Sequence, residues 1–187
     1  MTMTAPQPAR ITIRRPTAPT APQEVAPSFR IDAPLAGLRV GMRHEGSWRS
    51  WMLIVEEWTQ FLVADGAVPV ILQTGERVGE EGEQTRKEID AWVADVDCAV
   101  SGLGTCGSCT SWTVADAVAV EAGAKPAVAA VTSEFEAHAN NMASYLGHGD
   151  LKVLVLPYPL EARPEEELRA IAAEYYPQFL SMIGATR

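Results

Sequence analysis

The chain has 187 residues, of which 47% are hydrophobic, and it carries a formal net charge of −9 at neutral pH. This length and composition fit one soluble globular domain with a full core. The acidic balance disfavours nucleic acid or a membrane surface as the main partner, because both are themselves anionic. The sequence also lacks a run of about 18 apolar residues, so we expect no membrane-spanning helix.

Residues 1–36 are rich in proline, alanine and threonine, and they include Arg10, Arg14 and Arg15 with no acidic residue before Glu24. This composition predicts an extended arm without a core of its own. We expect the arm either to assemble a homo- or hetero-oligomer or to pack on its own domain. Proline and threonine follow the paired arginines where an export signal needs apolar residues, so we expect a cytoplasmic protein.

Beyond residue 36, short β-rich runs alternate with helix-length segments, which is typical of a parallel sheet built from βαβ units. The predicted strands are Leu38–Met42, Val68–Leu72, Cys98–Ser101, Ala127–Val131 and Lys152–Leu156. The first three predicted helices span residues 48–65, 85–93 and 110–122. The fourth is predicted from a capping box at Ser133 and Glu136 and from a stop at Gly147. The last begins at Pro164 and is interrupted near Pro177. We expect residues 37–187 to form a single three-layer α/β domain with a flavodoxin-like, mostly parallel five-stranded sheet.

Ligands of open parallel sheets bind beyond the carboxyl ends of the strands. The loops that follow the predicted strands should therefore meet at one edge of the domain, and most of them carry groups that can bind a ligand or take part in chemistry. The candidate substrate-binding residues are Arg43, Glu45, Gly104, Thr105, Gly107, Ser108, Thr110, Trp112, Thr132, Glu134 and Tyr158.

One of these loops carries two of the three cysteines. Cys106 and Cys109 are separated by Gly107 and Ser108, where a predicted strand runs into a helix. A cysteine at a helix N-terminus has its thiolate stabilised by the helix dipole and by free N–H groups, which lowers its pKa. Two thiols at this spacing can close a disulfide, share a metal, or act as a nucleophile and its resolving partner. In a reducing compartment such a pair is more often catalytic or metal-binding than structural.

His44, which directly follows the first predicted strand, is the candidate catalytic base or proton donor, but it could equally cap a helix or pair with Glu45. His138 lies within the fourth predicted helix, where a packing or surface role is more common. Cys98 belongs to an apolar strand and is expected to be a buried structural thiol. An alternative zinc or iron site would combine four of these residues: Cys106, Cys109, His44 and His138.

No cofactor is predicted. The glycines around the cysteines do not form a G-x-G-x-x-G pattern and no Walker lysine follows them, so a nucleotide is not expected. A flavodoxin-like outline does not by itself imply flavin, because fold alone does not carry function. Thiol chemistry here would therefore depend on an external thiol reductant or on a partner subunit.

The stretch from Asp97 through Pro159 resembles the UGSC family of proteins and selenoproteins, whose motif is selenocysteine or cysteine followed by Gly-Ser-Cys. The matching segments are residues 102–112, 126–135, 142–143 and 155–159. The resemblance implies that Cys106 occupies the selenocysteine position, so that Cys106 attacks and Cys109 resolves. The same loop is more remotely similar to the selenocysteine-containing, substrate-activating subunits of glycine and proline reductases, which work inside hetero-oligomeric complexes.

The leading hypothesis is a thiol-dependent redox enzyme or enzyme subunit. In it, the Cys106 thiolate attacks a small electrophilic substrate and Cys109 releases the product by forming a disulfide. The alternatives are a metal-binding subunit that uses the cysteines as ligands, and a non-catalytic subunit that assembles a larger enzyme through the arm.

Overall fold

The computed structural model describes residue 26 and residues 28–187. In chain order the elements are β1 (Ala33–Pro34), β2 (Arg39–His44), α1 (Arg49–Ala64), β3 (Val68–Gln73), α2 (Gly79–Asp95), β4 (Cys98–Gly104), α3 (Gly107–Ala122), β5 (Ala127–Thr132), the 3-10 turn η1 (Ser133–Phe135), α4 (Glu136–Tyr145), β6 (Lys152–Leu156), α5 (Glu165–Ile183) and β7 (Ala185–Thr186). All five strands predicted from the sequence are present, and four of them extend further at their carboxyl ends than expected.

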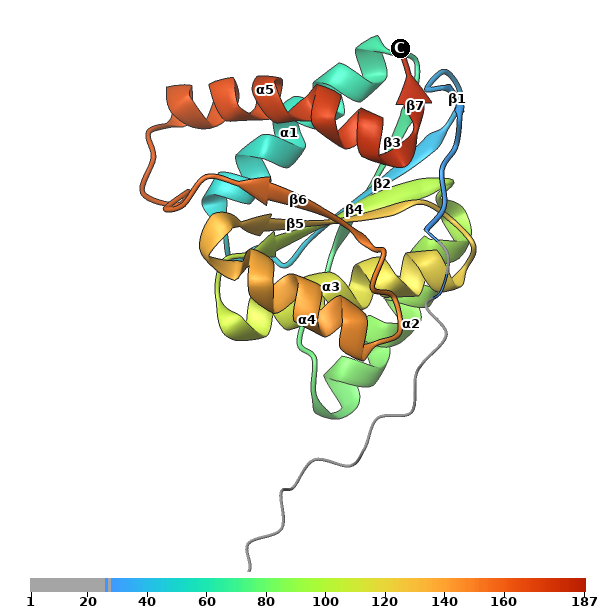
Figure 1. The fold of residues 1–187 in the computed structure, drawn as a ribbon, viewed down its shortest axis with the longest axis vertical. Helices are drawn as coiled ribbons and strands as arrows, with labels where there is room; N and C mark the ends of the chain where they lie inside the picture. Colours follow the sequence, from blue (N-terminus) through green and yellow to red (C-terminus); the bar gives the residue numbers. More distant parts are fainter. Residues whose placement is uncertain (1–25, 27) are drawn as a thin grey trace, which may run out of the picture.

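The main sheet has the strand order β3-β2-β4-β5-β6, and every neighbouring pair is parallel. This is the doubly wound order of flavodoxin-like folds. Helices α1 and α5 cover one face, whereas α2, α3 and α4 cover the other, so the predicted three layers are confirmed (Figure 1). The strand order reverses between β2 and β4. The carboxyl ends of these two strands therefore flank the crevice where such folds bind ligands.

Two apolar layers hold the helices on the sheet. On the α1 and α5 side, Trp58 is fully buried and stacks on Phe179, with ring centroids 5.2 Å apart. The indole N–H of Trp58 also donates to the carbonyl of Ala172, at an N···O distance of 2.8 Å. The aromatic stripe on α1 is therefore core, as its helical spacing predicts.

Three predicted helix details were wrong. Helix α2 begins at Gly79 rather than near residue 85. The negative charges of Glu80 and Glu81 in its first turn interact favourably with the helix dipole, which offsets the low helix propensity of the glycines. Helix α5 continues through Pro177, since its apolar residues on both sides of the proline pack into the core. The expected capping box is not formed: Ser133 opens η1, and α4 begins without a side-chain cap.

The last residues of the segment expected to be an arm pack on the domain. Strand β1 pairs in parallel with β7, and the side chain of Leu35 is fully buried in the core. The N–H of Leu35 also donates to the carbonyl of Thr186, at an N···O distance of 2.8 Å. The folded unit thus begins before residue 37, while residues 1–25 and 27, which contain the expected arginine anchors, lie outside the described residues.

Within the described part of the chain, every helix is too short or too polar to cross a bilayer.

Candidate active site

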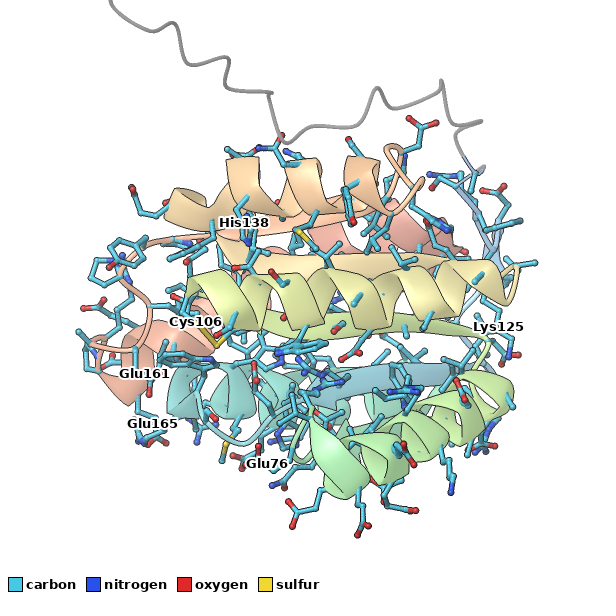
Figure 2. The ribbon with its side chains drawn as sticks, turned by 90° about the horizontal axis from the view of Figure 1, so that it is seen from below. Glu76, Cys106, Lys125, His138, Glu161 and Glu165 are labelled. Atoms are coloured by element: carbon cyan, nitrogen blue, oxygen red, sulfur yellow. A yellow bond between two sulfur atoms is a disulfide. The ribbon has the colours of Figure 1, made fainter. Side chains whose placement is uncertain are left out.

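Cys106 and Cys109 are joined by a disulfide, with their Cα atoms 5.3 Å apart. Figure 2 shows Cys106 at one end of α3 and Lys125 beyond the other end, which places the disulfide at the carboxyl edge of the sheet. Cys106 is the N-cap residue of α3, and its sulfur accepts the backbone N–H of Cys109 at an N···S distance of 3.1 Å. The hydroxyl of Ser108 lies 3.6 Å from the same sulfur. Both cysteines are partly exposed.

The turn before Cys106 requires a glycine at position 104. A Cβ atom there would lie 2.7 Å from a methyl carbon of Val131 and 2.9 Å from the hydroxyl of Thr110. Both distances are shorter than side-chain carbon contacts allow, so only glycine lets β4 pass this closely to β5 and α3. Gly104 therefore shapes the turn from within the core, where it is buried.

Three threonines fix the conformation of the same turn. The hydroxyl of Thr110 donates to the carbonyl of Cys106, at an O···O distance of 2.6 Å, and the hydroxyl of Thr132 donates to that of Thr105 at 3.1 Å. Thr110 and Thr132 are fully buried. These residues, which the sequence predicts to bind substrate, hold the cysteine loop against β5.

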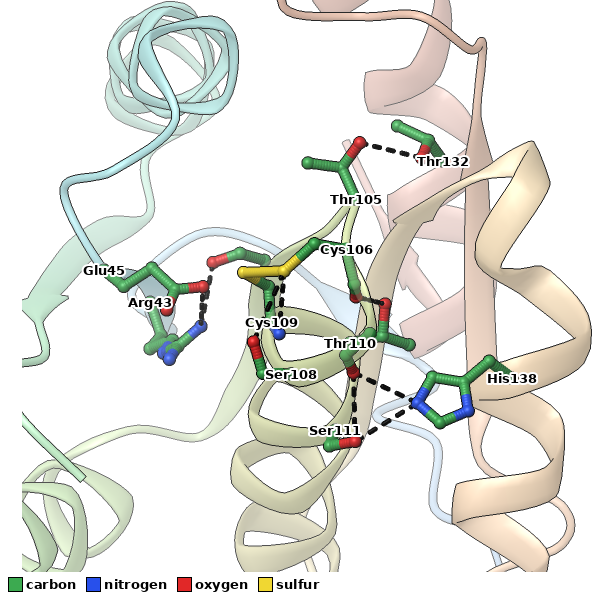
Figure 3. The surroundings of a disulfide bond; sticks show 12 residues. Arg43, Glu45, Thr105, Cys106, Ser108, Cys109, Thr110, Ser111, Thr132 and His138 are labelled. Carbon is green, nitrogen blue, oxygen red and sulfur yellow. Dashed lines mark hydrogen bonds and ion pairs between the residues drawn. A yellow bond between two sulfur atoms is a disulfide. The ribbon is translucent and has the colours of Figure 1, made fainter. Parts of the chain in front are cut away.

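His138 contacts the first turn of α3 from α4. Its Nε2 atom lies 3.1 Å from the carbonyl oxygen of Gly107 and 3.2 Å from the hydroxyl of Ser111. Figure 3 places His138 on one side of the disulfide and the pair Arg43 and Glu45 on the other. His138 is thus positioned to orient the start of α3.

A buried group of charges lies next to the cysteine loop. The side chain of Arg43 is fully buried, with its Nε atom 2.8 Å from a carboxylate oxygen of Asp116 on α3. Its Nη1 atom donates to the carbonyl of Gly102 at 3.0 Å, and it lies 3.8 Å from the carboxylate of Glu45. Burial lowers the pKa of Arg43, and Asp116 opposes this effect. Arg43 therefore ties the end of β2 to both β4 and α3.

Arg77 completes this group from the loop before α2. Its two terminal nitrogens contact the two carboxylate oxygens of Asp116 at 3.1 and 2.6 Å, a bidentate geometry that favours a fixed orientation. The guanidinium also lies over the ring of Trp112, 5.4 Å from its centroid. Asp116 thus compensates two arginines and holds Trp112 indirectly in place.

An open cavity of about 650 Å³ reaches the cysteine motif at Ser108, although neither cysteine is among the residues that line it. It is lined mostly by polar and charged residues from the end of β3, the loops after β2 and β3, and the first two turns of α2 and α3: Glu45, Ser47, Gln73, Thr74, Gly75, Glu76, Arg77, Val78, Glu81, Ser108 and Trp112. We call it the thiol cavity. Of the predicted substrate-binding residues, Glu45, Ser108 and Trp112 line it, and Arg43 lies behind Glu45.

His44 lines a different cavity, of about 330 Å³, together with Met52 and Ile71. Successive side chains of a strand point to opposite faces of the sheet, so Arg43 faces α3 whereas His44 faces α1. Burial and the neighbouring Arg43 lower the pKa of His44, and its Nδ1 atom accepts the N–H of Gly46 at 3.2 Å. A catalytic role of His44 remains a prediction from the sequence that these contacts do not support.

Two other predicted binding residues lie outside the thiol cavity. Glu134 is exposed on η1, and Tyr158, in the loop after β6, is 50% exposed. The four residues of the alternative metal site do not converge, because His44 and His138 contact different elements. Among the described residues, no group of three or more histidine, cysteine or carboxylate side chains is arranged to hold a metal ion.

Sequence reasoning missed Arg77 and Asp116. Arg77 lies in an acidic stretch that the composition predicts to be a solvated loop, yet its side chain is only 12% exposed. Asp116 carried a usable signal, because it is a single carboxylate in the apolar middle of α3, a position that favours a paired charge.

Comparison with curated proteins gives no match to this chain. Comparison with protein families matches residues 12–185, which include every element from β1 to α5, to the UGSC family. This match spans most of the chain, and it agrees with the resemblance carried by Cys106, Gly107, Ser108 and Cys109. The chain therefore belongs to the UGSC family.

Proposed function

We propose that this chain is a thiol-dependent redox enzyme, or the thiol-bearing subunit of one. The observation that carries the proposal is the Cys106–Cys109 disulfide at the N-terminus of α3, beside an open polar cavity. Membership of the UGSC family is compatible with this chemistry. Cys106 is proposed as the attacking residue and Cys109 as the resolving one.

The contacts of Cys106 support its role as the nucleophile. In the reduced protein, its sulfur would keep its place at the N-terminus of α3, where the backbone N–H of Cys109 donates to it. A donor and a helix dipole directed at the sulfur stabilise the thiolate over the thiol, and the thiolate is the attacking species. Cys98 has the opposite surroundings: burial and the nearby Asp97 raise the pKa of this thiol to about 12.

The thiol cavity supports a small polar substrate. Its lining combines the carboxylates of Glu45, Glu76 and Glu81 with the side chains of Gln73 and Thr74. Trp112, which is 37% exposed, supplies an apolar wall. A substrate seated there would come nearest to the cysteine motif at the end that Ser108 lines.

With a disulfide as the electrophile, the proposed cycle balances as follows. The Cys106 thiolate attacks one substrate sulfur, a mixed disulfide forms, and the other sulfur leaves as a thiolate. Cys109 loses its proton and attacks Cys106, which closes the protein disulfide and releases the second substrate sulfur. The two protein thiols thus give two electrons to the substrate, and an external dithiol or a partner subunit restores them.

Single cysteine variants test this proposal. The pre-reduced protein is mixed with dithiodipyridine as a model disulfide, and the products are weighed by intact-mass spectrometry. Cys106→Ser should form no adduct at the motif, whereas Cys109→Ser should accumulate a pyridyl adduct on Cys106 because no thiol resolves it. Cys98→Ser is the matched control and should behave as the unmodified chain. Formation of an adduct on Cys109 in Cys106→Ser as fast as the adduct forms on Cys106 in Cys109→Ser would contradict the assignment.

A further inference from the structure

Glu45 is an ionisable group beside the disulfide to which the proposed cysteine steps give no role. It follows the end of β2 and lines the thiol cavity together with Ser108, the residue before Cys109. Figure 3 shows Glu45 on the side of the disulfide opposite His138. Resolution by Cys109 needs an acceptor for the thiol proton, so the groups on this side of the disulfide bear directly on that step.

The surroundings of Glu45 suit a proton acceptor. Its Oε1 atom is buried and has no hydrogen-bond partner among the described residues. The closest cation, Nη1 of Arg43, lies 3.8 Å away. Burial raises the pKa of Glu45, and Arg43 opposes that rise. A carboxylate of this kind holds a proton more readily than an exposed one, while the arginine keeps the ionised form accessible.

The other charged groups near Glu45 are committed to contacts or are exposed. They are Arg43 on β2, Arg77 in the loop before α2, Asp116 on α3, and two carboxylates that line the same cavity, Glu76 and Glu81. Asp116 is already shared by the two arginines, and Glu76 and Glu81 are exposed. Among these four carboxylates in the described part of the chain, only that of Glu45 has a buried oxygen without a hydrogen-bond partner.

On the basis of the proposed thiol function, we infer that Glu45 accepts the proton of the Cys109 thiol as Cys109 attacks the adduct on Cys106. The sulfur–sulfur bond between Cys106 and the substrate breaks, and the bond between Cys106 and Cys109 forms. The departing substrate sulfur leaves with the electron pair, and Glu45 returns the proton to it. Glu45 ends the step as the carboxylate, ready for another cycle after an external dithiol has reduced the protein disulfide.

Single-turnover kinetics with dithiodipyridine separate this step from the first. Pre-reduced protein in excess releases one pyridinethione when Cys106 forms its adduct and a second when Cys109 resolves it, and both are followed by absorbance. In Glu45→Gln the second release should slow by about 100-fold at neutral pH, a typical contribution of general base catalysis. The first release, which reports access to the cavity that Glu45 lines, should change much less. The pyridyl sulfur departs as an anion that the ring stabilises, so its departure needs no acid and the probe isolates proton acceptance; the anion takes up its proton afterwards to become pyridinethione.

The pH profile supplies a readout that a merely structural role would not change. In the unmodified chain, the resolution rate should rise with pH through the raised pKa of Glu45, because the carboxylate is the active form. In Glu45→Gln this limb should be absent, and the rate should rise only where Cys109 itself ionises. Glu45→Asp should keep the limb at a reduced rate.

Glu174→Gln, which changes an exposed carboxylate on α5, is the matched control and should leave both releases unchanged. Resolution in Glu45→Gln with the rate and pH profile of the unmodified chain would overturn the role of Glu45 while leaving the proposed function intact. Failure of the unmodified chain to form an adduct on Cys106 would overturn the proposed function, and the role of Glu45 with it.

Discussion

At the scale of single residues, the chain keeps its thiols in opposite environments. Cys106 is partly exposed at the start of α3 and receives a backbone N–H, whereas Cys98 is fully buried in β4. Solvation and the helix terminus favour the thiolate of Cys106, and burial disfavours that of Cys98. The difference in reactivity therefore comes from position in the fold rather than from the cysteine side chain itself.

Alkylation of the reduced protein with iodoacetamide should modify Cys106 at neutral pH and leave Cys98 unmodified. The pKa of Cys98, raised to about 12, leaves almost no thiolate at that pH. Peptide mass spectrometry over a pH series measures both rates, and the fully unfolded protein provides the reference in which the two cysteines should react alike. Equal rates in the folded protein would contradict an activated Cys106.

The pair formed by Glu121 and His148 gives a prediction for stability against pH. The carboxylate of Glu121 is buried and lies 2.9 Å from Nδ1 of His148. Burial raises the pKa of Glu121, and the hydrogen bond from His148 opposes that rise. The folded state therefore binds this proton more tightly than the unfolded state, so the stabilisation is present at low pH and is lost as the pH rises to the raised pKa.

Replacing Glu121 with glutamine removes this titration. The free energy of unfolding of the unmodified chain, relative to that of Glu121→Gln, should fall as pH rises from the ordinary carboxyl pKa to the raised one, and should level off above it. Urea unfolding at a series of pH values measures the difference. Glu174→Gln should show no such trend, and an increase in the difference with pH would reverse the sign assigned to Glu121.

At the scale of elements, the site depends on Asp116, because this residue joins parts that are distant in sequence. It contacts Arg43 at the end of β2 and Arg77 before α2, and it is itself carried by α3. The strand order brings β2 and β4 together at the switch point, and the helix after β4 supplies the carboxylate that pairs both arginines. The loops on either side of the thiol cavity are thus held by one buried anion.

Asp116→Asn should destabilise the fold by about 3–5 kcal/mol, because it leaves two buried or nearly buried guanidinium groups without their anion. Chemical denaturation measures this loss. Glu165→Gln is the comparison: Glu165 forms exposed ion pairs with Arg49 and Arg169, and its loss should cost less than about 1 kcal/mol. Similar losses in the two variants would show that the buried charges do not hold the loops.

At the scale of the whole molecule, assembly through the N-terminal arm remains a proposal that rests on composition. The residues before Glu24 contain three arginines and no acid, and the chain as a whole carries a net charge of −9. Attraction between a basic segment and an acidic domain favours contact with a second copy or another subunit. A truncation that tests this must stop before residue 26, because the N–H of Ala26 donates to the carbonyl of Gly147 and Leu35 is buried in the core.

Removal of residues 1–25 should keep the α/β domain folded, as measured by circular dichroism, and should lower the mass in solution, as measured by light scattering. Removal of residues 1–36 serves as the contrasting truncation. It also deletes β1 and the buried Leu35, which should cost about 2–5 kcal/mol for the lost side chain alone. An unchanged mass after the shorter truncation would contradict assembly through the arm.

The residue pattern by itself determined the sheet and its helices. The tryptophan stripe of α1 has the period of a helix, and the apolar run Lys152–Leu156 has the short length and the β-branched residues of a strand, so both could be read without tertiary information. The Cys106 motif could also be placed from the sequence. It lies where a predicted strand runs into a predicted helix, and this junction is at the carboxyl edge of a parallel sheet. Local rules failed at Pro177 and at Gly79, where packing and the helix dipole outweigh the propensity of the residue.

Only the tertiary structure decided which residues share the site. His44 and Glu45 are adjacent in sequence, yet they line different cavities, because consecutive residues at the end of β2 face opposite layers. Arg77 and Asp116 are separated by 39 positions and carry no local pattern that links them. Their pairing depends first on the strand order, which brings the loops after β2 and β3 and the helix after β4 to one edge of the sheet. It depends also on energy, because charges that burial removes from water must be compensated by opposite charges.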